Sequence, residues 1–327
     1  MQEKKKRVIL QRYTESFLDD SCHLYSVFVM SEFIRTQLAR VLRRLAWLFP
    51  DRLYLQLFYR LAMNSWPRLD HPVLFSEKMQ WLKLHMRQPF LTMHVDKLLV
   101  KDYVGEHLGK EYICPKLGDW DNVDEIDFAS LPKQFVLKTT HGGGNEGVVV
   151  CKDKDALDWE AAKAKLAVNM KENIYDCYRE WPYKYVKRRI FAEKYLGDNI
   201  VDYKFYCCNG EVVCILLCVG RQEGHVKYFF LDKEWHLCPY NKDSIELADE
   251  FSEAPPENLQ QMLEIAAKLS KGFPFVRIDL FDVDGMIYFG EYTFFPASGL
   301  DPKKTMLFEQ LLGEKIDLSL CDSIPYQ

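Results

Sequence analysis

Two consecutive apolar segments that each contain an acidic residue constrain the fold of this chain more than any other feature. Residues 275–282 and 286–293 have the aromatic and β-branched character of strands, and an Asp-Gly pair at 284–285 separates them. They therefore predict an antiparallel hairpin. Asp279 lies inside the first segment and Glu291 inside the second. Because a buried carboxylate is costly unless it is paired or bound to a metal, this hairpin predicts a functional site.

The register of the hairpin decides whether the two acids can share an ion. With a two-residue turn at 284–285, regular pairing points Asp279 and Glu291 to opposite faces of the sheet. A three-residue loop, residues 283–285, with a bulge places them on the same face as diagonal neighbours. We therefore predict the three-residue loop, with a positive φ at Gly285.

Helical and strand patterns alternate along the rest of the chain. Helices are expected over residues 31–63, with a break at Pro50-Asp51, and over 76–85, 92–107, 158–171 and 257–271. Strands are expected at 112–114, 135–138, 148–151, 190–196, 203–208 and 212–219, the last two joined by a turn at Asn209-Gly210. The predicted class is α+β, with a helical, basic and amphipathic extension at 1–70 and one larger domain at 71–327.

Composition excludes several classes of protein. The net charge is −5, which argues against a nucleic-acid partner. The ten cysteines include no Cys-x-x-Cys pair, and several lie in apolar runs, so we expect free thiols in a reducing compartment. Lys4–Arg7 is not followed by an apolar signal core, and no apolar stretch reaches the length of a membrane span. We expect a cytoplasmic protein.

The N-terminal part has one basic amphipathic segment. Residues 1–22 are polar, and we expect them to be poorly ordered. In residues 31–63, apolar side chains recur at helical spacing and arginines lie between them. Such a segment can lie on anionic lipid at the inner face of the membrane, or it can be a helical cap whose arginines are only solvated.

Two further clusters carry charged residues at the ends of strands. Lys138 ends a strand and precedes a loop with Gly142, Gly143 and Gly144, a composition that lets backbone amides approach phosphate. No helix follows with Gly-Lys-Ser/Thr, so the loop is not a Walker A motif, and by itself it could be a flexible hairpin tip. The second cluster runs from Glu193 to Asp202 across the end of one strand and the start of the next. Without other signals it could be two surface acids.

The hairpin has the composition of a site for Mg²⁺ and phosphate. Two carboxylates on neighbouring strands suit a hard cation, and Mg²⁺ takes some of its oxygens from substrate phosphates. Arg277 can stabilise charge that develops on a transferring phosphoryl group. The alternative is a structural ion pair between Arg277 and Asp279, with Glu291 in solvent.

The order of the three clusters resembles the running order of the ATP-grasp fold. A lysine with a glycine loop comes first, Glu-Lys-x-Leu second, and an Arg-x-Asp hairpin with Glu-x-Thr third. The resemblance is closest to the TupA-like branch, named for teichuronopeptide biosynthesis, and extends over residues 75–312. It includes Phe-Ser-Glu-Lys-Met-Gln-Trp-Leu-Lys at 75–83 and Arg-Glu-Trp-Pro-Tyr-Lys at 179–184. It implies two α+β subdomains that grip ATP.

The resemblance also implies roles for individual residues. The phosphate contacts are Lys97, Lys138, Gly142, Gly143 and Gly144. The contacts to adenine and ribose are Glu193, Lys194, Leu196 and Asp202. The ligands of one or two Mg²⁺ ions are Asp279, Glu291 and Thr293, the last at a place where many ATP-grasp ligases have asparagine. Arg277 and Lys138 are the catalytic cations.

The implied activity is that of a carboxylate–amine ligase that works through an acyl phosphate. The resemblance suggests a uronic acid or amino acid in cell-surface polysaccharide biosynthesis as the substrate. No Gly-x-Ser-x-Gly or paired Cys and His motif offers a nucleophile. A kinase of the same fold, a glycosyltransferase and a binding module with a decayed site remain alternatives. Residues 179–184 are either an acceptor contact or a packed connector.

Overall fold

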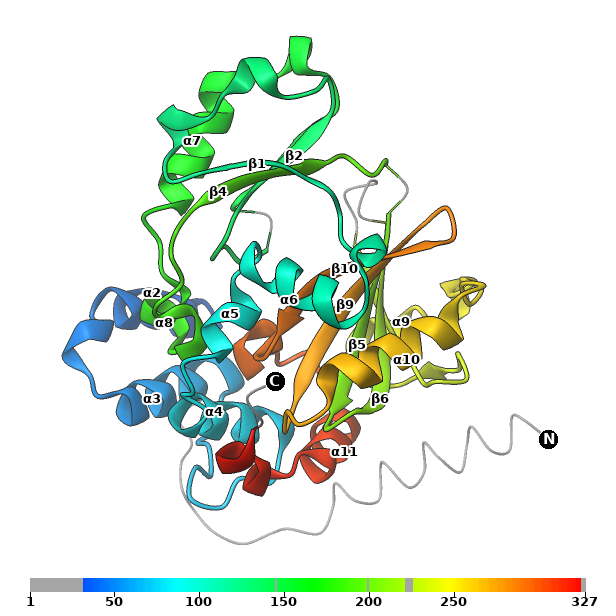
Figure 1. Cartoon of the computed structure of the whole chain (residues 1–327). Coiled ribbons are helices and arrows are strands. Elements are labelled where there is room, and N and C mark those ends of the chain that lie inside the picture. Colours follow the sequence, from blue (N-terminus) through cyan, green and yellow to red (C-terminus); the bar gives the residue numbers. More distant parts are fainter. Residues whose placement is uncertain (1–31, 145, 199, 221–225, 325–327) are drawn as a thin grey trace, which may run out of the picture.

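The computed structural model describes residues 32–144, 146–198, 200–220 and 226–324. The polar segment 1–22 lies outside the described residues. Two antiparallel sheets form two lobes, and the segment with α5 and α6 lies between them (Figure 1). The mixture of helices and antiparallel strands confirms the α+β class. The nine cysteines in the described part of the chain are free thiols.

The smaller lobe is a four-stranded sheet covered by one helix. Its strands are β1 (Lys116–Trp120), β2 (Phe135–Thr139), β3 (Val148–Cys151) and β4 (Ile190–Lys194), in the order β1-β4-β2-β3. Helix α7 (Trp159–Asn169) packs on one face, where Leu137 and Leu166 are fully buried. Because side chains alternate along β2, Lys138 points away from this core.

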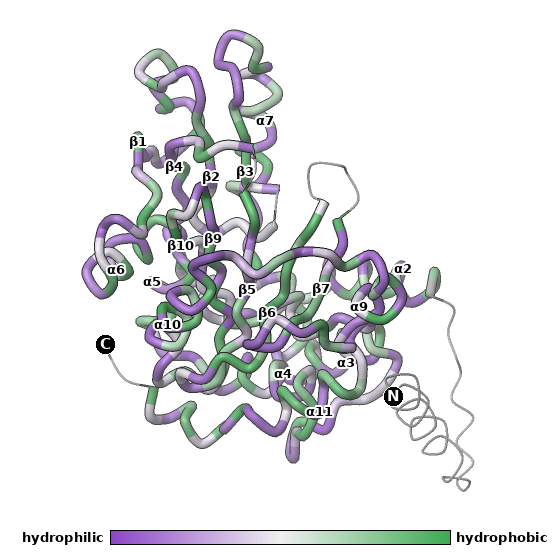
Figure 2. Tube along the Cα trace, turned by 90° about the vertical axis from the view of Figure 1, so that its right-hand side faces the viewer, coloured by the Kyte–Doolittle hydropathy of each residue, from purple (hydrophilic) through white to green (hydrophobic). Residues whose placement is uncertain are grey.

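The larger lobe is a six-stranded sheet with helices against it. Its strands are β5 (Val201–Cys208), β6 (Glu211–Val219), β7 (Lys227–Leu231), β8 (Leu237–Cys238), β9 (Val276–Val283) and β10 (Met286–Thr293). The order is β10-β9-β5-β6-β7-β8. The helices are α4 (Phe75–His85), α9 (Lys242–Glu246), α10 (Leu259–Ser270) and α11 (Met306–Lys315). Strands β5 and β6 are largely apolar (Figure 2) and contribute to the main core.

The expected turn at Asn209-Gly210 is confirmed. Cys208 pairs with Glu211, and both turn residues have positive φ, 45° and 86°. Short 3-10 turns connect other elements. They are η2 (Lys110–Tyr112), η3 (Val123–Glu125), η4 (Phe128–Ser130), η5 (Lys154–Ala156), η6 (Trp181–Tyr183), η8 (Ala248–Glu250), η9 (Pro296–Gly299) and η10 (Leu318–Ser323).

The helix expected over 92–107 is two helices. Helix α5 (Leu91–Val95) ends before Asp96, which is extended, and α6 (Leu99–His107) follows. The Asp96 carboxylate accepts hydrogen bonds from the amides of Leu98 and Leu99, at 2.9 and 3.1 Å. An aspartate that bonds backbone amides two and three residues ahead favours a helix start over a helix interior. The strand expected at 112–114 is also wrong, because η2 occupies Lys110–Tyr112 and β1 begins after Pro115.

The predicted three-residue loop in the β9–β10 hairpin is wrong. Met286 pairs with Val283, so the turn has only two residues. Asp284 and Gly285 have φ of 52° and 78°, which confirms the positive φ at Gly285 and matches a type I′ turn. The extra residue is in the strand instead, where the register shifts between Phe289 and Glu291. A type I′ turn fits the twist of the strands, and a glycine at position 290 tolerates the bulge.

Helices α2 (Glu32–Arg44) and α3 (Asp51–Met63), with η1 (Ala46–Leu48) between them, form the described part of the N-terminal extension. They share a small core that contains Leu42 and Tyr54. Tyr54 also donates a hydrogen bond to the carbonyl oxygen of Cys177 in α8 (Ile174–Tyr178), at 2.7 Å. A domain boundary at residue 70 stays a prediction. No helix within the described residues is long and apolar enough to cross a membrane.

Candidate active site

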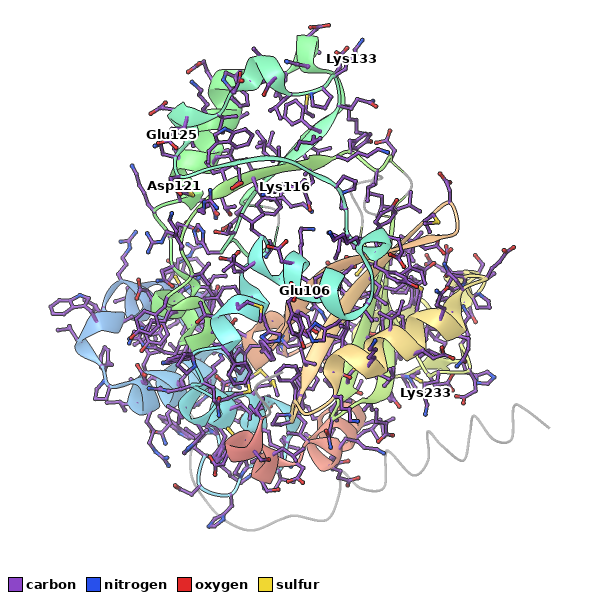
Figure 3. The ribbon with its side chains drawn as sticks, in the orientation of Figure 1. Glu106, Lys116, Asp121, Glu125, Lys133 and Lys233 are labelled. Carbon is purple, nitrogen blue, oxygen red and sulfur yellow. The ribbon has the colours of Figure 1, made fainter. Side chains whose placement is uncertain are left out.

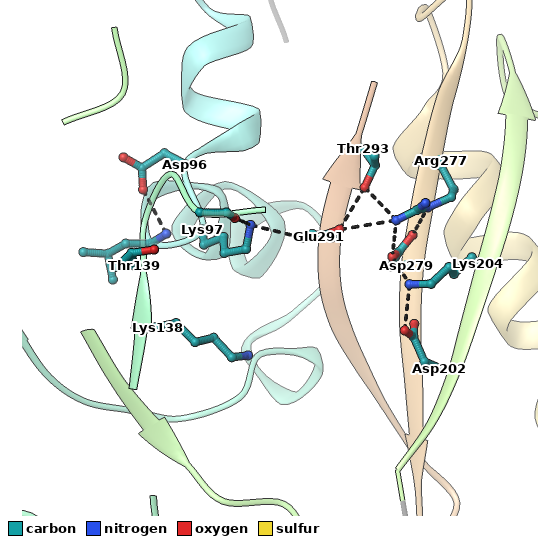
Figure 4. Close-up of polar contacts among 12 residues, drawn as sticks. Asp96, Lys97, Lys138, Thr139, Asp202, Lys204, Arg277, Asp279, Glu291 and Thr293 are labelled. Atoms are coloured by element: carbon teal, nitrogen blue, oxygen red, sulfur yellow. Dashed lines mark hydrogen bonds and ion pairs between the residues drawn. The ribbon is translucent and has the colours of Figure 1, made fainter. Parts of the chain in front are cut away.

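Asp279 and Glu291 meet on one face of the β9–β10 hairpin. The bulge makes them direct partners in the ladder, and Arg277 lies between their carboxylates (Figure 4). The Arg277 guanidinium contacts both oxygens of Asp279, at 2.6 and 2.7 Å, and one oxygen of Glu291 at 3.3 Å. It also donates to the hydroxyl of Thr293 at 3.0 Å, which donates to Glu291 at 3.0 Å. The three predicted metal ligands are therefore adjacent.

Lys204 completes this cluster from β5. It is the ladder partner of Asp279, and its ammonium lies between the carboxylates of Asp279 and Asp202, 2.7 Å from the latter. Asp202, the predicted ribose contact, is thus held by Lys204 in this structure. The sequence interpretation assigned no role to Lys204. The sequence pattern that could have identified Lys204 is the Asp-x-Lys spacing at 202–204, which places both charges on one face of an otherwise apolar strand.

Lys97 connects the two lobes. Its ammonium is 3.2 Å from Glu291 and donates to the carbonyl oxygen of Gly142 at 2.7 Å. Its backbone amide donates to Thr140 of the smaller lobe at 3.0 Å. The break at Asp96 explains this position, because Lys97 lies between two helices rather than inside one. Figure 4 shows Glu291 between Lys97 on one side and Arg277 on the other.

Glu193 holds two lysines in the smaller lobe. It is 2% exposed, and its oxygens contact Lys138, at 2.7 Å, and Lys101. Burial alone would raise the pKa of Glu193, but Lys138 and Lys101 outweigh it and lower the pKa to about 2. Glu193 is therefore a carboxylate at neutral pH and positions Lys138. The family resemblance placed Lys101 in the same motif as Asp96-Lys97, but it assigned no contact to Lys101.

The remaining predicted adenine contacts lie at the exit from β4. Lys194 is the exposed last residue of this strand, and Leu196 follows it in the connection to β5. The backbone of Lys194 is fixed on both sides: its amide donates to Pro115 at 2.9 Å, and its carbonyl oxygen accepts from the thiol of Cys114 at 3.3 Å. The connection between the lobes is thus anchored next to the residues for which the family resemblance implies contacts to adenine.

The glycine loop joins β2 to β3 and has a rigid base. Thr139 donates to Asn169 at 2.6 Å, and a Cβ at Gly142 or Gly147 would approach the Thr139 hydroxyl oxygen to 2.4 or 2.2 Å. Only glycine fits these two positions. The tip is exposed at 143–144, so its backbone faces solvent.

The electrostatics of the hairpin suit a bound cation and an anionic ligand. Burial would raise the pKa of Glu291, but Lys97, Arg277 and Lys204 hold it well below its usual range. Within the described residues, no three His, Cys, Asp or Glu side chains gather as a metal cluster. Two carboxylates and a hydroxyl nevertheless fit Mg²⁺, which takes its remaining oxygens from phosphate and water. Lys97, Arg277 and Lys204 contact the hairpin carboxylates, so positive charge is also present for an anionic ligand.

A second buried cluster, absent from the sequence-based assignments, lies under the end of β10. Lys83 is fully buried and donates to the carbonyl oxygen of Ser298 at 2.8 Å and to its hydroxyl at 2.6 Å. The same hydroxyl interacts with the side chain of Glu180 and favours its charged form, against the effect of burial on the Glu180 pKa. Ala297 and Ser298 have positive φ, 47° and 58°, which is strained for residues with a Cβ and common at functional sites. The motifs at 75–83 and 179–184 were the sequence signal for this Lys83–Ser298–Glu180 cluster.

Tyr183 and Arg179 connect this cluster to its surroundings. Burial raises the pKa of Tyr183 well above its usual range, and the negative charges of Glu291 and Glu180 raise it further. Arg179 is buried, 3.0 Å from Asp51, and stacked 4.5 Å from the ring centre of Tyr54. Arg179 is thus a packed connector to α3.

The chain is similar to several known proteins. D-alanine–D-alanine ligase from Bacillus anthracis superposes with a TM-score of 0.43 and 16% identity, over 71% of each chain. The Helicobacter pylori enzyme gives 0.41 and 14%, over 72% of this chain and 60% of that one. The ATP-grasp ligase PsnB, in complex with its minimal precursor, Mg and ADP, gives 0.37 and 14%, over 76% and 65%. No curated protein matches. The TupA-like ATP-grasp profile matches residues 77–317, and the chain belongs to this family and has its fold.

Proposed function

We propose that this protein is an ATP-dependent ligase that joins a carboxylate to an amine and releases ADP and phosphate. The observation that carries the proposal is the shared face of Asp279 and Glu291, with Arg277 and Lys97 on either side of Glu291. Family membership supports the use of ATP by this site. Positioning and charge neutralisation supply most of the catalysis in such chemistry.

The triphosphate of ATP lies between the lobes in this proposal. Lys97 and Lys138 contact its oxygens, and the loop at 142–144 covers them with backbone amides. Adenine lies at the anchored exit of β4, against Glu193, Lys194 and Leu196, with Asp202 near the ribose. Mg²⁺ between Asp279, Glu291 and Thr293 neutralises phosphate charge when it is bound.

The reaction has two steps. In the first, a carboxylate oxygen of the substrate attacks the γ-phosphorus, the bond to the β–γ bridging oxygen breaks, and ADP leaves. Arg277 and Lys138 stabilise the charge on the transferring phosphoryl group. In the second, an amine attacks the acyl carbon, the bond from this carbon to the phosphate oxygen breaks, and the amine loses a proton. Phosphate leaves and an amide remains.

We assign the substrate to the class of uronic acids or amino acids of cell-surface polysaccharides, following the teichuronopeptide pathway for which the family is named. The Lys83–Ser298–Glu180 cluster supports a binding site for the acceptor substrate at the end of β10. This cluster fixes the turn that continues β10 beyond Thr293. We place the enzyme in the cytoplasm, where free cysteines and ATP occur together.

The test is ADP release from Mg-ATP with a panel of uronic acids, their nucleotide sugars and amino acids. Hydroxylamine replaces the amine, so an acyl phosphate is trapped as a hydroxamate that mass spectrometry identifies. Glu291→Gln should form no hydroxamate, whereas Asp284→Asn, in the exposed turn of the same hairpin, should match the wild type. A phosphorylated hydroxyl as product would establish a kinase instead. Turnover of a nucleotide sugar without ATP would establish a glycosyltransferase.

A further inference from the structure

Helix α2 and turn η1 carry an apolar surface that the other described residues leave exposed. Phe33 is 73% exposed and Trp47 is 79% exposed, and five aliphatic residues between and beside them are more than a third exposed. This α2 face consists of Phe33, Ile34, Leu38, Val41, Leu45, Trp47 and Leu48. Scattered exposed apolar residues are normal, but a continuous group on one helix marks an interaction site.

The α2 face is presented outwards by a helix that is fixed to the body. On its inner side Leu42 and Ala46 are buried against α3. Arg43 donates to the hydroxyl of Tyr178 at 3.3 Å, and Arg35 donates to the carbonyl oxygen of Leu61 at 3.3 Å. Figure 1 shows α2 at the outer edge of the larger lobe. The helix is therefore held by one side, and its apolar stripe faces away from the core.

The charge around the α2 face is positive. Arg40 and Arg44 are exposed next to the apolar stripe, and residues 33–50 contain no aspartate or glutamate. An amphipathic helix with arginines beside its apolar stripe and an exposed tryptophan at one end has the composition of helices that lie in the headgroup region of a bilayer. Long arginine side chains reach lipid phosphates while the apolar stripe enters the acyl boundary.

We propose that the α2 face docks this protein on an anionic lipid surface, with α2 parallel to the bilayer plane. Charge complementarity selects this occupant, because the surface joins an apolar stripe to the positive charge of the exposed Arg40 and Arg44. Within the basic amphipathic segment 31–63, the surface that can contact lipid lies on α2 and η1. Helix α3 instead buries its apolar side chains Tyr54, Leu55, Phe58 and Tyr59. This inference goes beyond the proposed ligase activity and does not depend on it.

Co-sedimentation of the full chain with vesicles tests the inference. One set of vesicles is phosphatidylcholine, and the other is equal parts phosphatidylcholine and phosphatidylglycerol. We expect binding to the anionic vesicles only, and a decrease with added salt. Replacing Arg40 and Arg44 by glutamine together should weaken binding roughly 10- to 30-fold. Trp47→Ser should weaken it at high salt as well, because it removes apolar burial rather than charge.

Two matched controls separate this surface from general charge and hydrophobicity. The double variant Lys133→Gln and Lys233→Gln makes the same change in net charge on residues away from α2 (Figure 3) and should bind as the wild type does. Val168→Ser removes an exposed apolar side chain from α7 and should also have no effect. Equal loss in the controls and the α2 variants would overturn the inference.

Deletion of residues 1–31 tests whether these residues, rather than the α2 face, contact the lipid. Binding that persists or increases without them supports docking through α2. Binding that disappears on deletion and ignores the Arg40, Arg44 and Trp47 changes would assign the lipid contact to residues 1–31 and overturn the inference. Absence of binding to both vesicle types, together with a dimer that Trp47→Ser dissociates, would assign the α2 face to a second copy of the chain.

Discussion

Glu291 lies directly opposite Asp279 because a bulge at Gly290 shifts the register of the β9–β10 ladder by one residue. Without this shift the two-residue turn would direct Glu291 to the other face, away from Arg277. A Cβ at Gly290 would lie 3.0 Å from the carbonyl oxygen of Asp279 and 3.0 Å from the ring of Phe281. The glycine thus permits a close contact that any larger residue would disturb.

Gly290→Ala should therefore lower turnover about a hundredfold, because displacement of Glu291 by a fraction of an ångström disturbs the phosphate and metal geometry. The free energy of unfolding should fall by about 1–3 kcal/mol. Gly285→Ala is the control: it introduces strain at a positive φ of 78° but its Cβ contacts nothing. It should lose stability and retain turnover. Equal turnover in both variants would show that the bulge has no role in catalysis.

Asp279→Asn and Glu291→Gln should each abolish turnover while circular dichroism shows a folded protein. Both carboxylates are proposed ligands of Mg²⁺, so calorimetric titration of ATP should lose its dependence on Mg²⁺. Asp279→Asn should cost more stability, about 3–5 kcal/mol, because Arg277 and Lys204 lose a partner that is 1% exposed. Unchanged Mg²⁺ dependence in both variants would place the metal elsewhere.

Lys97→Ala and Lys138→Ala should each weaken ATP binding about tenfold to a hundredfold, the value of one charge-assisted contact. Lys97→Ala should also release the glycine loop, since Lys97 holds the carbonyl oxygen of Gly142. Lys133→Ala, at an exposed site of the smaller lobe, is the control and should bind ATP normally. The assignment fails if calorimetry finds wild-type ATP affinity in both active-site variants.

Glu193 should make the protein sensitive to acid. Lys138 and Lys101 lower its pKa in the folded state from 4.5 to about 2. A depressed carboxyl pKa stabilises the fold above the unfolded value, and this stability is lost as pH falls from 4.5 towards 2. The loss should reach about 3 kcal/mol in urea unfolding experiments. Glu193→Gln should be less stable at neutral pH and should lack this component of the pH dependence.

Glu180→Gln and Lys83→Met should impair the acceptor step and spare ATP affinity, because both side chains hold Ser298 rather than the nucleotide site. Burial raises the pKa of Glu180 to about 7 and lowers that of Lys83 to about 8. As pH falls below 7, Glu180 gains a proton and its hold on Ser298 weakens. Wild-type turnover should therefore decrease on this acidic side, and Glu180→Gln should lack that decrease.

Glu309→Gln is the matched control for the Glu180 variant. Glu309 is also buried and bonds α4 through Ser76, at 2.9 Å to its amide and 2.6 Å to its hydroxyl, but it is not part of the Ser298 cluster. It should lose stability without a change in the pH profile of turnover. If Glu180→Gln and Glu309→Gln changed the pH profile of turnover in the same way, the Lys83–Ser298–Glu180 cluster would have only a packing role.

The sequence alone determined the elements whose cause is local. The turns at 209–210 and 284–285 follow from dipeptides that tolerate positive φ, and the helices and most strands follow from their periodicity. The order of the charged motifs also identified the ATP-grasp family. Each of these depends on residues close together in the chain. Asp96 was the local exception: the periodicity over 92–107 continues through it, and only the family resemblance indicated a helix start at Asp96-Lys97.

Only the tertiary structure decided which charges meet. The bulge at Gly290 depends on how β10 lies against Asp279 and Phe281, and the hairpin sequence does not show at which residue the register shifts. Lys204 pairs with Asp279 because β5 lies next to β9. Lys83 contacts Ser298 although the two residues are 215 positions apart in the sequence. Such ion pairs arise where strands and helices distant in sequence pack together, since a buried charge is stable only beside its partner. The hydrophobic periodicity of a segment indicates which face of its helix or strand a residue occupies. It does not indicate which residues of other elements lie opposite that face.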